Sequence, residues 1–111
     1  MGHTMGATGL YLPTYDLLRF GILFLNKGMW ENNRVISEKW VKMATSVQVE
    51  QNNSGFGWWI KSDKCYYAVG AWSQYLYIIP DRKIVFAEHA FESHEKADEL
   101  EKIFNKYLEI I

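Results

Sequence analysis

The serine, histidine and cysteine side chains are the groups in this chain that could carry chemistry. Ser93-His94-Glu95-Lys96 is its one Ser-x-x-Lys pattern, in which a lysine amine can take the proton of a serine hydroxyl and make it a nucleophile for acyl transfer. A pattern this short also arises by chance. Ser93 suits the N-cap of a final helix, with Lys96 on the polar face. We therefore expect no catalytic role for this pair.

The histidines and the cysteine point to no further chemistry. His3, His89 and His94 do not have the spacing of a metal site. Cys65 is the only cysteine, so an intrachain disulfide is excluded and the redox compartment stays open. We expect Cys65 to be a small buried hydrophobe on a strand. No metal and no cofactor are predicted.

Composition places the chain among folded globular proteins. Its 111 residues suit a single domain over 1–111, and 49% are hydrophobic and 16% aromatic. The net charge of −1 argues against nucleic-acid binding, which needs a basic stripe. No apolar run reaches the length of a membrane span, and no signal peptide is recognisable. Residues 1–6 give no reason for order and could be a cloning remnant.

The first half of the chain predicts two helices. The first spans 15–27, with Thr14 as its N-cap and Gly28 as the C′ residue that ends it. It is apolar nearly all round, so it needs burial on more than one face. A turn over 30–36 has two asparagines at its tip.

Ser37 is predicted to cap the second helix, which covers about residues 38–45. This helix carries Trp40, Val41 and Ala44, which we expect to face inward. The polar residues 46–54 then predict a loop.

The second half changes to a period of two. Two hairpins are predicted, with turns at 62–64 and 80–83, and both faces of the third strand are apolar, so both should be covered. The predicted strands are Gly57–Lys61, Cys65–Val69, Gln74–Ile79 and Ile84–Glu88. A helical stripe follows at Leu100, Ile103, Phe104, Tyr107, Leu108 and Ile111. The fold class is therefore α+β, an antiparallel sheet of three to four strands flanked by helices.

Five groups of residues in fixed order carry a family resemblance. They are Gly9-Leu10-Tyr11-Leu12 with Asp16-Leu17 and Arg19-Phe20-Gly21; Leu25-Asn26 with Gly28 and Trp30; Val35-Ile36-Ser37 with Trp40-Val41; Gly55 with Gly57-Trp58-Trp59; and Gly70 with Gln74-Tyr75, Tyr77 and Ile79-Pro80. Over roughly 6–110 the chain resembles the C-terminal part of serine beta-lactamase-like hydrolases, the family of class C beta-lactamases, penicillin-binding proteins and related esterases. The resemblance implies a partial beta-lactamase/transpeptidase-like fold.

The resemblance also implies acyl transfer on amide or ester bonds in a parent enzyme. The family's catalytic Ser-x-x-Lys and Tyr-x-Asn motifs lie upstream of the part matched here, and this chain contains no Tyr-x-Asn. We therefore expect a C-terminal portion that is inactive alone, whatever peptide or beta-lactam-like ligand the parent binds. Members of the family are found in the cell envelope, outside the cell and in the cytoplasm, so the compartment stays unknown.

One family site should fall within the matched part, namely the strand edge that binds substrate. It aligns with Gly70, Ala71, Trp72 and Ser73, where the family's Lys- or His-containing triplet is missing. A backbone N–H donor could remain, since it needs no particular side chain. Gly70 is thus either a remnant of the oxyanion edge or a bulge or twist in an edge strand.

Two further expectations concern partners. In the family, the strand that corresponds to Ile84–Glu88 pairs with an upstream strand, so we predict self-association through this edge or through the final helix. The alternative to an enzyme portion is a non-enzymatic module that binds a peptide or glycan or takes part in assembly. It is suggested by aromatic residues, among them Trp58, Trp59, Trp72 and Tyr75.

Overall fold

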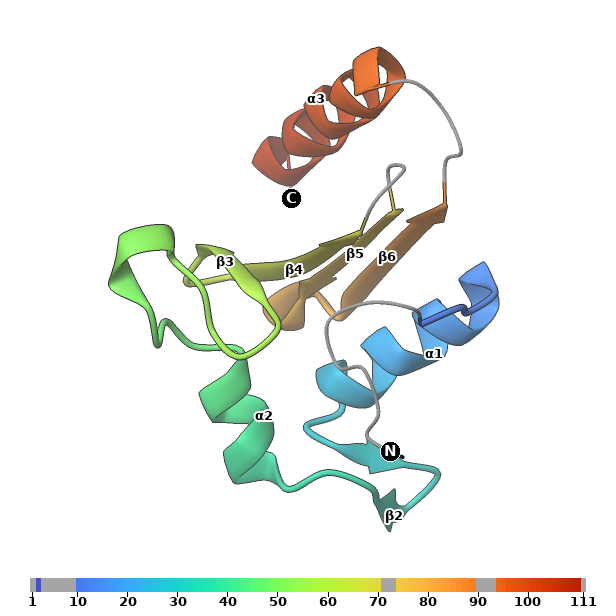
Figure 1. Cartoon of the computed structure of the whole chain (residues 1–111), viewed down its shortest axis with the longest axis vertical. Helices are drawn as coiled ribbons and strands as arrows, with labels where there is room; N and C mark the ends of the chain where they lie inside the picture. Colours follow the sequence, from blue (N-terminus) through green and yellow to red (C-terminus); the bar gives the residue numbers. More distant parts are fainter. Residues whose placement is uncertain (1, 3–9, 71–73, 90–93, 111) are drawn as a thin grey trace.

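A computed structural model describes residues 2, 10–70, 74–89 and 94–110. The predicted α+β class is confirmed, with helices on both faces of an antiparallel sheet (Figure 1). The elements are α1 (Thr14–Leu25), β1 (Met29–Trp30), β2 (Asn33–Arg34), α2 (Glu38–Ala44), β3 (Trp59–Ser62), β4 (Cys65–Gly70), β5 (Gln74–Ile79), β6 (Ile84–His89) and α3 (His94–Ile110), with 3-10 turns at Glu50–Asn52 and Pro80–Arg82. Most of residues 1–6 lie outside the described part.

The main sheet has the strand order β3-β4-β5-β6, all antiparallel. Both predicted hairpins are present, with bounds that shift by one or two residues. The register is regular between β4 and β5 and between β5 and β6, whereas β3 shifts register between Ile60 and Ser62. The outer strands are thus a short, irregular β3 and a regular six-residue β6.

The sheet separates two clusters of buried side chains. This confirms the prediction that both apolar faces of the strand Gln74–Ile79 are covered. Leu76 and Ile78 face α1 and α2, where they pack with Phe24, Val41 and Trp58. Tyr77 and Ile79 face α3 and pack with Cys65 and Phe104. Helix α1 comes close to the sheet at Gly21, where an added Cβ would lie 2.5 Å from Cγ1 of Val85.

Helix α1 begins one residue earlier than the cap prediction. Pro13 occupies the N-cap position and Thr14 is already helical, so Thr14 does not cap the helix. Its hydroxyl instead lies 3.0 Å from Nδ1 of His89 at the end of β6. A proline fits this place because it lacks an N–H that the helix start could not use.

The end of α1 is also earlier than predicted. The helix stops at Leu25, and Lys27 takes the left-handed conformation (φ 57°) that we expected of Gly28. The Lys27 N–H donates to the carbonyl of Phe24, and the Gly28 N–H donates to the carbonyl of Leu23. These two bonds are those of a Schellman motif, so the predicted C′ position was wrong by one residue.

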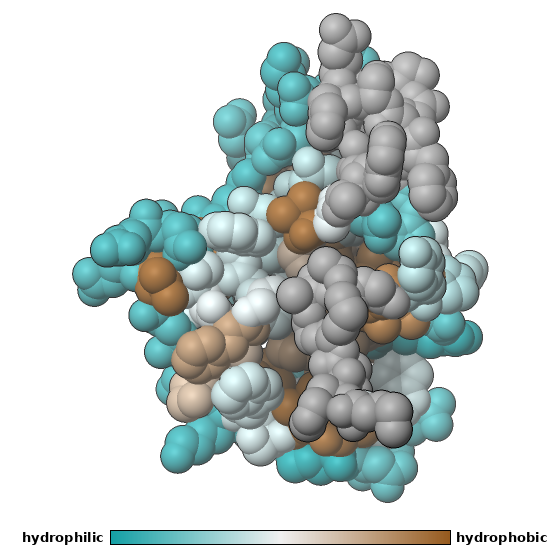
Figure 2. All heavy atoms as spheres, viewed as in Figure 1, coloured by the Kyte–Doolittle hydropathy of each residue, from teal (hydrophilic) through white to brown (hydrophobic). Residues whose placement is uncertain are grey.

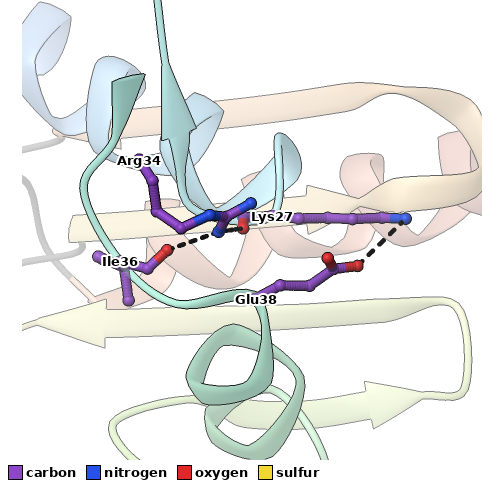
Figure 3. Close-up of polar contacts among 4 residues, drawn as sticks. All are labelled: Lys27, Arg34, Ile36 and Glu38. Carbon is purple, nitrogen blue, oxygen red and sulfur yellow. Dashed lines mark hydrogen bonds and ion pairs between the residues drawn. The ribbon is translucent and has the colours of Figure 1, made fainter. Parts of the chain in front are cut away.

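A two-residue hairpin follows, formed by β1 and β2. Glu31 and Asn32 form its tip, with φ of 46° and 67°; the prediction of two asparagines at the tip was therefore wrong by one position. Arg34 reaches back and donates hydrogen bonds to the carbonyls of Lys27 and Ile36, at 2.9 and 2.8 Å (Figure 3). This guanidinium ties the end of α1 to the approach to α2.

Helix α2 is capped as predicted, since the Ser37 hydroxyl accepts a hydrogen bond from the Trp40 N–H at 3.1 Å. Val41 and Ala44 are buried, but Trp40 is 44% exposed and stacks on Phe56. The prediction that Trp40 faces inward was wrong, because α2 has only two turns and its buried face is narrow. The following segment 46–54 is a loop, as expected, with a 3-10 turn at Glu50–Asn52 and an isolated antiparallel bridge between Val49 and Ser54.

Helix α3 is present, but only some residues of its predicted apolar stripe are buried against the sheet. Phe104 is buried and Leu108 is partly buried, whereas Ile103 and Tyr107 are 64% and 55% exposed. Ile111 lies outside the described residues. Among the described helices, none is both long and apolar enough to cross a bilayer.

Candidate functional site

The C-terminal end of β4, which contains the predicted edge residue Gly70, has no neighbouring described strand on one side. Strand β3 pairs with β4 only from Cys65 to Tyr67. On its other side, β4 pairs with β5 as far as Gly70, opposite Gln74. The last three residues of β4 therefore have a strand on one side and, within the described part of the chain, none on the other.

Backbone alternation identifies the groups that point to this open edge. Ser62 and Cys65 close a two-residue turn, so Cys65 turns its N–H and C=O towards β3. Every second residue does the same, which places Tyr67 and then Val69 on that side. Tyr67 has a partner in β3, whereas the N–H and C=O of Val69 have no strand partner among the described residues.

Gly70 lies at the end of a regular ladder. The register between β4 and β5 is unbroken up to Gly70, so the interpretation as a bulge is wrong; the irregular position is in β3. An added Cβ would lie 3.4 Å from Cβ of Gln74, an ordinary contact, so packing does not demand a glycine here. The other predicted edge residues, Ala71, Trp72 and Ser73, lie outside the described residues.

No nucleophile with an adjacent base appears among the described side chains. Ser93 lies outside them, and Lys96 is described only through the backbone of α3. Cys65 is buried as predicted, and burial raises the pKa of its thiol more than the nearby Lys61 lowers it. A thiol held protonated is a poor nucleophile.

The remaining ionisable groups of the described residues do not form a metal site or supply a catalytic base. No group of three or more His, Cys, Asp or Glu residues that could hold a metal occurs in the part of the chain that the structure describes. Burial raises the pKa of Tyr66 and of Tyr77 well above the ordinary value, with smaller contributions from neighbouring charges. Such phenols stay protonated near neutral pH and cannot act as bases.

A row of aromatic rings lies under α3. Tyr67 and Tyr75 stack on either side of Tyr77, with ring centroids 5.1 and 5.8 Å away. Lys61 lies about 6 Å from the centres of the Tyr67 and Tyr77 rings, and 3.9 Å from a carboxylate oxygen of Glu101 on α3. This row is a structural feature that attaches α3, since Tyr77 is buried with Phe104 of α3 and the partly buried Tyr67 and Tyr75 pack against them.

Two hollows of the surface lie at the other end of β4, around the turn between β3 and β4. One of about 850 Å³ is lined by residues of this turn, of the 3-10 turn after β5 and of the last part of α3. Another of about 560 Å³ lies between the same turn and the segment after α2. The sequence analysis missed both, because their walls come from segments that are distant in the chain.

The exposed aromatic surface differs in part from the one expected, since Trp59 is 38% exposed as expected but Trp58 is not exposed. Trp58 is buried at 4% exposure and packs against Phe24 and Tyr66, so it is not available to a ligand. Trp40 and Phe56 are instead the exposed pair, with rings stacked 5.5 Å apart. Hydrophobic atoms reach the surface in separate patches on the face shown in Figure 2.

Comparison of the chain with protein-family models and with curated proteins finds no match.

Proposed function

We propose that this chain is the C-terminal portion of a serine beta-lactamase-like or penicillin-binding-protein-like hydrolase. It would supply the sheet, the helices that cover it and one edge of the substrate cleft. The observation that carries the proposal is the open edge of β4 at Val69, at the strand end where the family's substrate edge aligns. The order of helices and strands, with both sheet faces covered, agrees with this assignment.

In such an enzyme the attacking serine would come from elsewhere in the parent. Its Oγ would bond to the carbonyl carbon of an amide or ester, and its proton would pass to a base. The carbonyl oxygen would then become an oxyanion, which backbone N–H groups stabilise. The leaving group would depart with a proton as the C–N or C–O bond breaks. The Val69 N–H is the donor that this chain offers.

The first test is hydrolysis of a chromogenic cephalosporin and of a short-chain nitrophenyl ester. The chain alone should give no turnover, because it lacks a nucleophile paired with a base among its described residues. Turnover that Ser93→Ala abolishes would contradict the proposal. The coding sequence immediately upstream should encode Ser-x-x-Lys and Tyr-x-Asn in frame, and their absence would equally contradict it.

A sharper test uses the longer polypeptide encoded with that upstream sequence. Val69→Pro removes the edge N–H, and we expect kcat to fall by about 10²- to 10³-fold, as for the loss of one oxyanion donor. Val69→Ala is the matched control, because it shortens the same side chain and keeps the N–H. Equal kcat values for the two variants, with both folded by circular dichroism, would remove Val69 from the proposed cleft.

The second candidate function is a non-enzymatic binding module. It is favoured by the exposed stack of Trp40 and Phe56, since flat aromatic faces bind sugars and peptides. Titration of tryptophan fluorescence with muropeptides and with a beta-lactam separates the two functions. A saturable muropeptide signal that Trp40→Ala abolishes, in a chain without hydrolysis, would favour the module.

We further propose self-association, and the two sheet edges differ in how well they suit it. Strand β3 has four residues, a shifted register and a lysine, all of which discourage pairing with another chain. Strand β6 has six residues in regular register, and Glu88 carries its only formal charge apart from His89. The alternation used above leaves the outer N–H and C=O groups on Val85, Ala87 and His89. The exposed side of α3 is the alternative surface.

A further inference from the structure

The hollow of about 850 Å³ has the size of a small-molecule site and lies away from the proposed cleft edge. It opens at the end of the sheet where β4 begins, whereas Val69 is near the end of that strand. Its walls belong to three segments: the turn between β3 and β4, the 3-10 turn at Pro80–Arg82, and the last turns of α3.

The apolar part of this hollow comes from neighbouring strands and from α3. Cys65 and Ile79 are 5% and 4% exposed and belong to the cluster beneath α3. Leu108 packs against that cluster from the helix. All three line the hollow, so it offers an aliphatic contact surface.

Charges of opposite sign line its two sides. Lys64 and Arg82 belong to the two sheet turns, and neither forms an ion pair with a described residue. Glu109 lies on the opposite side, in the last turn of α3. Asp81 and Lys61 also line the hollow, and Lys61 forms an ion pair with Glu101.

Asn105 contributes a polar side chain to the lining of the hollow. Its side-chain oxygen Oδ1 is buried without a hydrogen-bond partner in the described part of the chain. A buried oxygen without a partner is costly. Turning the amide towards a bound donor would therefore break no existing bond of this oxygen.

We propose that this hollow binds a short zwitterionic peptide with an aliphatic side chain. Lys64 and Arg82 bind its carboxylate, Glu109 binds its ammonium group, and Cys65, Ile79 and Leu108 contact the side chain. Asn105 hydrogen-bonds the ligand between the two ends. The site is independent of the proposed hydrolase function, because it lies at the other end of β4.

The dipeptide Leu-Leu is the probe, followed by NMR on the full chain. Its addition should shift the side-chain amide resonances of Asn105 with a dissociation constant below about 1 mM. N-acetyl-Leu-Leu and Leu-Leu amide each lack one charge and should bind at least about tenfold more weakly. No shift at millimolar Leu-Leu would overturn the proposal. Equal binding of all three ligands would overturn the zwitterion assignment and leave an apolar site only.

Two substitutions test the two ends of the site. Lys64→Met should weaken Leu-Leu at least about fivefold while Leu-Leu amide binds as it does to the wild type, because the amide lacks the group that Lys64 contacts. Glu109→Gln should weaken Leu-Leu at least about fivefold while N-acetyl-Leu-Leu binds as it does to the wild type, because the acetylated ligand lacks the ammonium group that Glu109 contacts. Lys106→Met is the control on α3, since Lys106 is exposed and does not line the hollow. Equal losses for both ligands in Lys64→Met would contradict the assigned orientation.

Discussion

At the residue scale, two glycines share a left-handed backbone conformation but differ in the space around them. Gly28 and Gly57 both have positive φ, at 89° and 79°. An added Cβ on Gly28 would lie 2.0 Å from the carbonyl oxygen of Ile36, whereas one on Gly57 would meet nothing within 4 Å. Only Gly28 is therefore required both by its conformation and by its packing.

We expect Gly57→Ala to lower the free energy of unfolding by about 1 kcal/mol, the cost of a left-handed alanine. Gly28→Ala should lower it by about 3 kcal/mol or more, because the hairpin after α1 must also move. Urea unfolding followed by tryptophan fluorescence measures both. Similar losses for the two variants would show that the approach of Ile36 to Gly28 is not rigid.

At the element scale, Phe104 is the buried contact with the sheet among the α3 side chains that the structure describes. The Phe104 ring lies 4.2 Å from that of Tyr77 and 5.0 Å from that of Phe86, measured between centroids. Ile103 precedes it and is 64% exposed. Phe104→Ala should cost about 3 kcal/mol and increase amide exchange throughout α3. Ile103→Ala should change stability by less than about 0.5 kcal/mol. Unchanged exchange in α3 of Phe104→Ala would show that other contacts hold the helix.

The tyrosines of the sheet make the stability of the folded protein depend on pH in the alkaline range. Burial raises the pKa of Tyr66, Tyr67, Tyr75 and Tyr77, so each ionises at lower pH in the unfolded chain than in the folded one. Stability is therefore insensitive to these groups below about pH 10 and falls as the pH rises further.

Tyr77→Phe tests this effect. Above about pH 10 the fall in stability should be shallower by about 1.4 kcal/mol per pH unit, the contribution of one tyrosine. At pH 7 the variant should be about 1 kcal/mol more stable, because the buried Tyr77 hydroxyl has no partner among the described residues. Urea unfolding at several pH values measures both. A loss of stability at pH 7 would reveal a hydrogen bond to this hydroxyl.

The strands were more predictable than the helix ends and the exposed aromatics. Alternation along residues 74–79 identified both buried faces of β5 because each face packs on a helix. The end of α1 was misplaced because a lysine adopts the conformation usual for glycine, which no local pattern indicates. Trp58 and Trp40 exchanged their expected exposure because tertiary packing, and not composition, decides which aromatic faces the core.

At the scale of the whole molecule, the candidate cleft edge was only partly predictable. Gly70 is assigned to the proposed edge from its motif alone, whereas the open side of Val69 depends on where β3 stops pairing, and no single strand encodes that. The hollow at the other end of β4 depends on three segments coming together. Sites built from one strand are thus accessible to sequence reasoning, and sites built between elements are not.

Two surfaces of the whole molecule are proposed for self-association, and amide exchange distinguishes them without substitutions. In a dimer through β6, the outer N–H groups of Val85, Ala87 and His89 would become hydrogen-bonded. Their exchange should then slow as protein concentration rises, while sedimentation velocity shows a dimer. In a dimer through α3, these amides would not change, and Ile103→Glu with Tyr107→Glu would restore the monomer, since both side chains are exposed. A monomer at high protein concentration would exclude both surfaces and leave the edge of β6 to a different partner strand.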